Sequence, residues 1–162
     1  MGSWDSTDGL SDGGPPPAGA RPSSMETDPA EHLLKAIESA AIRSDHPYGG
    51  LEFQRRGVAV CYARLSRLGP RAVEVSGMYA PVRGGGCHAM GLIALLADLH
   101  GVTLRLVAAS AVPSRMDTER VVEWYRAYGF VGSARSQPYG GVPMARLPGR
   151  LFRPPVAGER QG

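Results

Sequence analysis

Cysteine is scarce in this chain of 162 residues, which contains only Cys61 and Cys87. Two cysteines cannot make the disulfide framework of a small secreted domain, and no Cys-x-x-Cys pair is present. The histidines are scattered and do not fall at the spacings of zinc ligands. We therefore expect neither a disulfide scaffold nor a metal site.

Long apolar runs are also absent. No stretch approaches the roughly 18 consecutive apolar residues that a transmembrane helix needs. Residues 1–10 are acidic and lack the basic and apolar regions of a secretory signal. We therefore expect a cytoplasmic protein with no membrane partner.

Lysine is nearly missing, because Lys35 is the one lysine among 18 basic residues. Charge is unevenly placed: residues 1–30 carry −4, so the net +3 of the chain leaves +7 on residues 31–162. A basic folded part suits an anionic ligand such as a nucleotide cofactor or a nucleic acid. The arginine bias of a GC-rich genome accounts for the charge equally well.

The composition divides the chain into three parts. Residues 1–28 are rich in Gly, Pro, Ser and Asp and cannot bury enough apolar surface to fold, so we expect a disordered tail. Residues 29–150 form one domain, and residues 151–162 form a flexible C-terminal tail. A docking role for the first tail stays open, although it lacks an aromatic and basic motif.

Periodicity and turn residues predict a mixed α/β fold. Asp28-Pro29 is a helix start, with the aspartate as N-cap. Gly101 and Gly129 are typical helix ends. The break over residues 45–50 and the turn at Gly69-Pro70 separate the remaining elements. We expect helices over 29–43, 86–100 and from Asp117 or Thr118 to 128, and strands from 58 to the Gly69 turn and over 72–79, 102–109, 130–135 and 142–147.

A glycine-rich turn joins one predicted strand directly to a helix. It reads Arg83-Gly84-Gly85-Gly86-Cys87. The first N–H groups of a helix have no internal partner and carry the positive end of the helix dipole, so they bind anions. Glycines let a bulky phosphate approach the backbone, and Arg83 adds a positive charge.

Three classes of ligand fit such a turn. A P-loop needs Gly-Lys-Ser/Thr, which is absent. A dinucleotide site matches formally at Gly84-x-Gly86-x-x-Ala89, but the next strand ends at Ser110 without the acid that holds the ribose, and too little chain follows. The third class is an acyl-CoA.

Arg83-Gly-x-Gly resembles the Arg/Gln-x-x-Gly-x-Gly/Ala signature of the GNAT acetyltransferases. Residues 92–106 look like the helix and strand that follow it in that family. Residues 121–130, which end in Tyr-x-x-x-Gly-Phe, are similar to the family's next helix. The likeness covers residues 58–148 and is closest to compact phage and bacterial members. The last small residue of the signature falls on the bulky His88, or on Ala89 after a shift of one residue.

The resemblance implies a GNAT-like acyl-CoA N-acyltransferase fold, with a central mixed sheet flanked by helices, and acetyl-CoA as co-substrate. In the family two middle strands splay apart, and the pantetheine arm lies between them along the first. A backbone N–H near Met78–Ala80 then holds the acetyl oxygen. The cofactor-binding residues implied are Met78, Tyr79, Ala80, Val82, Arg83, Gly84, Gly85, Gly86, Cys87, His88 and Ala89.

The resemblance also assigns catalytic roles. Tyr125 matches the tyrosine that protonates the departing thiolate, a role that suits a phenol. Tyr128 has the same chemistry but falls at a packing position. Glu74, on the strand before the turn, is the best candidate for the base that deprotonates the amine; a solvated carboxylate is the alternative.

The expected function is direct acetyl transfer from acetyl-CoA to a primary amine on a small molecule or protein. Two alternatives stay open. One is a GNAT-fold module that binds CoA and regulates without catalysis, suggested by His88. The other is acetylation of an amine linked to nucleic acid, suggested by the basic domain. A homodimer is possible in the family, and the acceptor depends on loops over 111–116 and 135–141.

Overall fold

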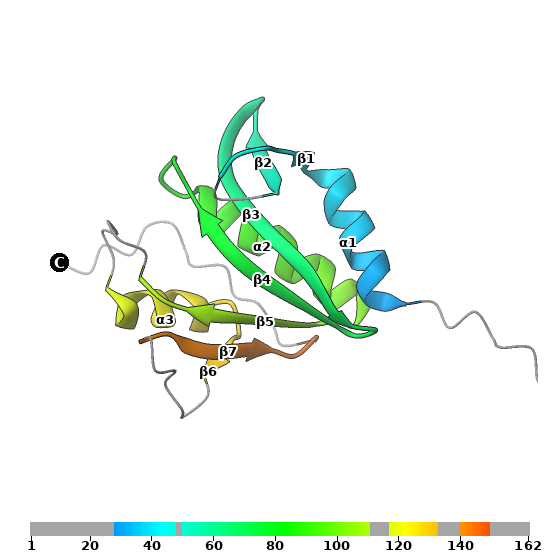
Figure 1. Cartoon of the computed structure of the whole chain (residues 1–162), viewed down its shortest axis with the longest axis vertical. Coiled ribbons are helices and arrows are strands. Elements are labelled where there is room, and N and C mark those ends of the chain that lie inside the picture. Colours follow the sequence, from blue (N-terminus) through cyan, green and yellow to red (C-terminus); the bar gives the residue numbers. More distant parts are fainter. Residues whose placement is uncertain (1–27, 48–49, 111–116, 133–139, 150–162) are drawn as a thin grey trace, which may run out of the picture.

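The computed structural model describes residues 28–47, 50–110, 117–132 and 140–149, which build one seven-stranded sheet and three helices (Figure 1). The strand order is β1-β2-β3-β4-β5-β7-β6. Only β4 and β5 are parallel among neighbours, so the mixed α/β class is confirmed and a doubly wound dinucleotide fold is excluded. The elements are α1 (Pro29–Ala40), β1 (Ile42–Arg43), β2 (Leu51–Arg55), β3 (Val58–Gly69), β4 (Ala72–Tyr79), α2 (Gly85–His100), β5 (Thr103–Ala108), α3 (Thr118–Arg126), β6 (Val131–Gly132) and β7 (Val142–Arg146).

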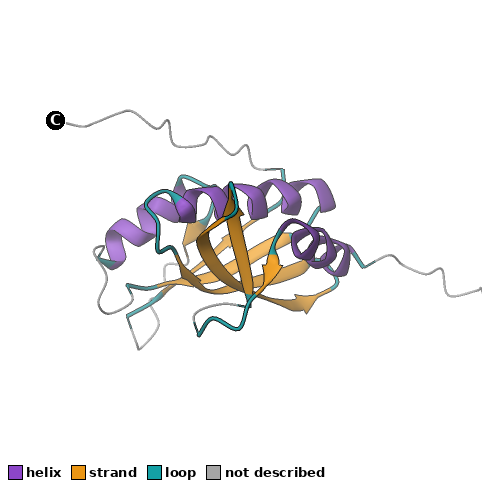
Figure 2. Cartoon of the chain, turned by 90° about the horizontal axis from the view of Figure 1, so that it is seen from above, coloured by secondary structure: helices purple, strands orange, loops and turns teal. Residues whose placement is uncertain are grey.

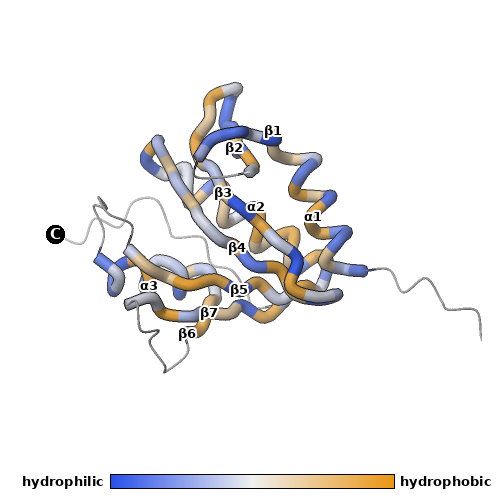
Figure 3. Tube along the Cα trace, viewed as in Figure 1, coloured by the Kyte–Doolittle hydropathy of each residue, from blue (hydrophilic) through white to orange (hydrophobic). Residues whose placement is uncertain are grey.

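The helices lie on one side of the sheet, as Figure 2 shows. We call this side the helix face and the other the open face. Strand β5 shows the division: Leu104 and Leu106 are buried on the helix face, whereas Arg105 and Val107 are exposed on the open face. In Figure 3, β5 is coloured mostly hydrophobic, whereas α1 alternates along its length. The side chains that α2 and α3 direct toward the sheet therefore reach it from the helix face.

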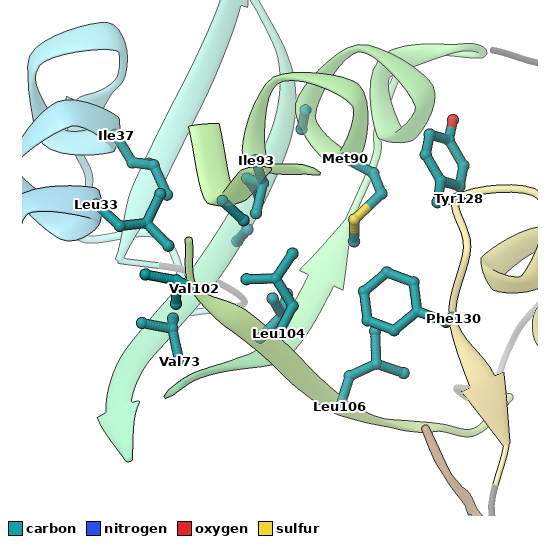
Figure 4. Packing of buried hydrophobic residues seen from close by; sticks show 14 of the residues in the cluster. Leu33, Ile37, Val73, Met90, Ile93, Val102, Leu104, Leu106, Tyr128 and Phe130 are labelled. Carbon is teal, nitrogen blue, oxygen red and sulfur yellow. The ribbon is translucent and has the colours of Figure 1, made fainter. Parts of the chain in front are cut away.

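The core fills the space between the helices and the sheet (Figure 4). Leu33 and Ile37 of α1 are fully buried, as the predicted helix periodicity requires. At the other end Met90 of α2 and Phe130 pack above Leu106 of β5. The core thus joins all three helices to β3, β4 and β5 and fixes the start of α2 relative to α3.

Capping residues and glycines in the sequence place most of the helix ends where they were predicted. The Asp28 carboxylate accepts hydrogen bonds from the N–H groups of Ala30 and Glu31, which confirms it as the N-cap of α1. Gly101 ends α2 in the left-handed conformation, with φ 66°, and its N–H donates to the last carbonyls of the helix. Asp117 caps α3 in the same way as Asp28 caps α1.

Two strands were not predicted. Helix α1 stops at Ala40 rather than at residue 43, because Ile42 and Arg43 leave it and pair with β2. Strand β2 buries Leu51 and Phe53 and leaves Glu52 between them half-buried, but a strand of five residues is too short to give a clear period. Strand β6 begins at Val131, one residue later than predicted, and β7 ends at Arg146, one residue earlier than predicted. The tails and the part of the predicted strand beyond residue 132 lie outside the described residues.

A buried ion pair ties the end of the sheet to α2. Arg146 of β7 is fully buried, and its guanidinium donates to both carboxylate oxygens of Asp98 at 2.7 and 2.6 Å. It also donates to the carbonyl of Tyr128 at 2.7 Å. Burial by itself raises the pKa of Asp98, but the hydrogen bonds from Arg146 and Gly149 outweigh it and lower that pKa. The pair therefore joins α2, the segment after α3 and β7.

Candidate functional site

Strands β4 and β5 separate halfway along their length. They pair from Ala72 with Thr103 to Glu74 with Arg105, and no further pairs are found between them in the described chain. Residues 75–79 of β4 and 106–108 of β5 continue beyond the last pair and diverge (Figure 1). The expected splay between the strands that hold Met78 and Val107 is thus confirmed. It leaves the inner edge of β4 free for another extended chain.

A bulge in β4 accounts for the divergence. Ala63 of β3 faces Met78 and Arg64 faces Ser76, so Gly77 has no opposite residue. Its φ is 66°, a conformation that glycine adopts without strain. A bulge bends its strand and increases the local twist. The bend turns the end of β4 away from β5, and a glycine inside a predicted strand was the available signal.

The uncapped start of α2 follows the free end of β4. Its N-cap is Gly84, with φ 82° and no side-chain hydrogen bond, and its first turn holds no acid. The backbone ladder begins with the His88 N–H, which donates to the Gly84 carbonyl at 3.1 Å. The N–H groups of Gly86 and Cys87 therefore have no acceptor in the helix. With the exposed Arg83 beside them, they fit an anion.

The three glycines of the turn have different roles. Gly84 has open space around its Cβ position. Gly85 is buried, and a Cβ there would lie 1.7 Å from the Val60 carbonyl oxygen. The expectation that all three open the backbone to a phosphate is therefore corrected, because Gly85 lets α2 pack against β3. Ala89 is likewise buried in the core, whereas His88 is exposed, so its bulk does not obstruct the turn from within the core.

Gly85 and Gly86 should respond very differently to alanine. In Gly85→Ala the new methyl group meets the Val60 backbone, so we expect loss of soluble protein or destabilisation of about 3 kcal/mol or more, as for severe overpacking. Gly86→Ala makes ordinary contact with the Trp124 ring, at 3.5 Å, and should fold normally. Urea unfolding of both variants measures this. Equal stability would show that α2 can move away from β3.

Tyr125 lies on α3, with its side chain packed against the core. Its ring contacts Trp124 and Phe130, with centroid distances of 4.8 and 5.5 Å. Burial, and next the neighbouring Cys61 thiol of β3, raise the pKa of Tyr125 to about 12. The phenol therefore stays protonated at any ordinary pH and is available as a hydrogen-bond donor.

Trp124 connects α3 to the start of α2, a role that the sequence did not reveal. Its six-membered ring lies next to Gly86, and its centroid is 5.0 Å from that of Tyr128. Tyr128 is fully buried, which confirms it as a core residue. Burial and a hydrogen bond with Cys87 raise the pKa of Tyr128. These rings hold the glycine turn and Tyr125 in one arrangement.

Glu74 lies on the open face, between Val73 and Val75, which are buried on the helix face. Its carboxylate accepts a hydrogen bond from Ser66 Oγ at 3.5 Å. It is the last residue of β4 to pair with β5, so it stands where the strands begin to diverge. The two predicted catalytic residues, Glu74 and Tyr125, thus lie on opposite faces of the sheet and not in contact.

Comparison with known proteins does not assign this chain to a family. No protein-family model matches the chain, and no curated protein matches it. One similar solved structure is described as Ard1 from Thermoplasma volcanium, at 16% identity and a TM-score of 0.48, over 73% of this chain and 76% of that one. No helix in the described part is long and apolar enough to cross a membrane. The described residues also contain no group of three His, Cys, Asp or Glu side chains able to hold a metal ion.

Proposed function

We propose that the protein is an N-acetyltransferase that uses acetyl-CoA and acetylates a primary amine by direct attack. The observation that carries the proposal is the splay of β4 from β5 directly before the uncapped N-terminus of α2. Strand β4 offers a free edge to an extended chain that carries amide groups, and α2 offers the N–H groups of its first turn to an anion. A ligand in which an amide-bearing chain is joined to an anionic group fits β4 and the start of α2 together.

The binding residues divide between these features. Arg83 and the N–H groups of Gly84, Gly86 and Cys87 bind the pyrophosphate. Met78, Tyr79 and Ala80 pair with the pantetheine arm through backbone groups, and Val82 leads from the strand into the turn. One N–H of this stretch donates to the acetyl oxygen. Bound acetyl-CoA supplies the acetyl group as a thioester, which is activated toward amines.

Tyr125 acts on the leaving sulfur from the helix face. A phenol with a pKa of about 12 gives up its proton reluctantly to a thiolate, whose conjugate thiol has a pKa near about 8.5. A strong hydrogen bond to the sulfur is therefore favoured over complete transfer of the tyrosine proton. Glu74 accepts the amine proton on the open face, which requires that the acceptor enters from that side.

The second candidate is a CoA-binding module without catalysis. This candidate is supported by the position of Glu74, which the sheet separates from Tyr125, so that Glu74 is not a base close to Tyr125. Acetyl-CoA binding without release of free CoA in the presence of amines would favour it.

Calorimetric titration with acetyl-CoA tests the proposal. We expect binding by the wild-type chain and an increase of about tenfold in Kd for Arg83→Ala, because a charge-assisted hydrogen bond contributes about 1.5 kcal/mol or more. Arg71→Ala is the matched control, since Arg71 is equally exposed but lies at the opposite end of β4, in the turn before it. Absence of binding at millimolar acetyl-CoA would reject the function and both candidates.

A further inference from the structure

The open face carries a groove of about 630 Å³ beside the point where β4 and β5 separate. Its walls come from the ends of β3 and β7, from β4 and β5, and from β6. This volume lies within the range of about 300–1,000 Å³ that is usual for small-molecule sites. The groove is on the face opposite to α2 and Tyr125, and of the residues assigned to the reaction above only Glu74 lines it.

The wall over β5, β6 and β7 is apolar. Val107, Val131 and Leu147 line it, and they are 45%, 53% and 54% exposed. The solvated side of a sheet normally carries polar residues, as the open face does on β2 with Glu52 and Gln54. Exposed apolar side chains that gather in a groove indicate a ligand with an apolar body.

A carboxylate and a guanidinium stand at the other side of the groove. Glu74 of β4 and Arg105 of β5 are register partners, the last before the strands diverge. No ion pair joins them, and the Arg105 side chain makes no hydrogen bond or ion pair with any residue of the described ranges. The only hydrogen bond of the Glu74 side chain within those ranges is the one from Ser66. Both charged groups are therefore available to a ligand that carries the opposite charges.

We infer that this groove binds the acetyl acceptor and that the acceptor is an apolar α-amino acid. Its ammonium faces Glu74, its carboxylate pairs with Arg105, and its side chain lies on Val107, Val131 and Leu147. The inference rests on the proposed function, because only the splay beside Glu74 gives the acceptor nitrogen access to an acetyl group held on the helix face. A polyamine would need several carboxylates and a nucleic acid would need a basic surface, and the groove offers one group of each charge.

The transfer balances with the groups named. The ammonium loses one proton to water before attack. The acceptor nitrogen then forms a bond to the acetyl carbon, the carbon–sulfur bond breaks, and a second proton leaves nitrogen for Glu74. Sulfur departs with the bonding electron pair and gains a proton from solvent, hydrogen-bonded to Tyr125 as it leaves. The products are an N-acetyl amino acid and free CoA.

Thiol release from acetyl-CoA tests the substrate class. The wild-type full-length chain should acetylate L-phenylalanine with a kcat/KM at least about tenfold above that for phenethylamine, which has the same body without the carboxylate, since one lost charge pair costs about 1.4 kcal/mol or more. Arg105→Gln should reduce this ratio to near one, and Arg105→Lys should restore part of it. Arg64→Gln is the control, because Arg64 lies on the open face outside the groove lining and should leave the ratio unchanged.

The outcomes separate this inference from the proposed function. Equal use of L-phenylalanine and phenethylamine by the wild type, or preference for spermidine, a peptide or an aminoacyl-RNA, would overturn the amino-acid site while leaving the acetyltransferase in place. Absence of acetyl-CoA binding in calorimetry would instead reject the enzyme. Calorimetric titration with L-phenylalanine alone tests the groove in that case: binding that Val107→Asp abolishes supports the site, and no binding by the wild type overturns it.

Discussion

Replacement of Tyr125 by phenylalanine should lower kcat for acetyl transfer about 100-fold, the lower end of the effect of a positioned proton donor. The affinity for acetyl-CoA should stay within about twofold, because the ring that packs against Trp124 and Phe130 is retained. Steady-state thiol release gives kcat, and calorimetry gives the affinity. Thermal unfolding should coincide with that of the wild type.

The control for this variant is Tyr62→Phe, which removes a phenol from β3 on the open face, away from α3. It should leave kcat unchanged. If Tyr125→Phe keeps kcat within about threefold of the wild type, the hydroxyl has no catalytic role and Tyr125 is only a packing residue.

The raised pKa of Tyr125 also fixes how the effect depends on pH. The neutral phenol is the form that donates, and with a pKa of about 12 it remains the dominant form up to about pH 11. The ratio of wild-type to Tyr125→Phe kcat should therefore be constant from about pH 6 to about pH 10. A ratio that falls above about pH 9 would mean that the phenol ionises near its ordinary pKa and is not desolvated.

Replacement of Arg146 by leucine should lower the free energy of unfolding by about 3–5 kcal/mol. The variant removes the partner of the half-buried Asp98 and leaves the carbonyl of Tyr128 without its donor. Urea unfolding measures the change. Arg43→Leu is the control, because Arg43 also pairs with an acid but is exposed on the edge of the sheet, and its loss should be hard to detect.

A second replacement distinguishes the buried charge from packing. Asp98→Leu combined with Arg146→Leu should recover much of the loss, since two apolar side chains leave no unpaired charge in the core. If Arg146→Leu alone unfolds like the wild type, the pair does not hold β7 to α2. If the double variant is as unstable as the single one, packing and not charge accounts for the loss.

The elements that the sequence predicts best have both a regular period and marked ends. Strand β4 was predicted with its observed bounds, because it lies between the Gly69-Pro70 turn and the glycine turn. Helix α2 differs from its prediction by one residue at its start, because the glycine turn precedes it and Gly101 ends it. Strands β1 and β2 lack this combination: β1 has two residues, and β2 has five, too few to establish a period. Strand β2 forms by pairing with β3 and β1 by pairing with β2, and neither depends on local preference.

The candidate site was predictable only in part. The anion-binding turn follows from local backbone chemistry, so Arg83 and Gly84 could be found from the sequence alone. The burial of Gly85 depends on where β3 passes, and the bulge at Gly77 is defined by its partners on β3. The face of the sheet on which Glu74 lies required the observed pattern of burial. The pairing of Asp98 with Arg146 joins residues 48 apart and has no local signal.

The central claim is that acetyl-CoA lies along the free half of β4 and on the start of α2. Backbone amide chemical shifts measured by NMR during titration with acetyl-CoA test it most directly. We predict saturable shifts at Met78, Tyr79, Gly84 and Gly86, with little change in α1. Shifts that are confined to other elements, or no shifts at millimolar acetyl-CoA, would contradict the claim.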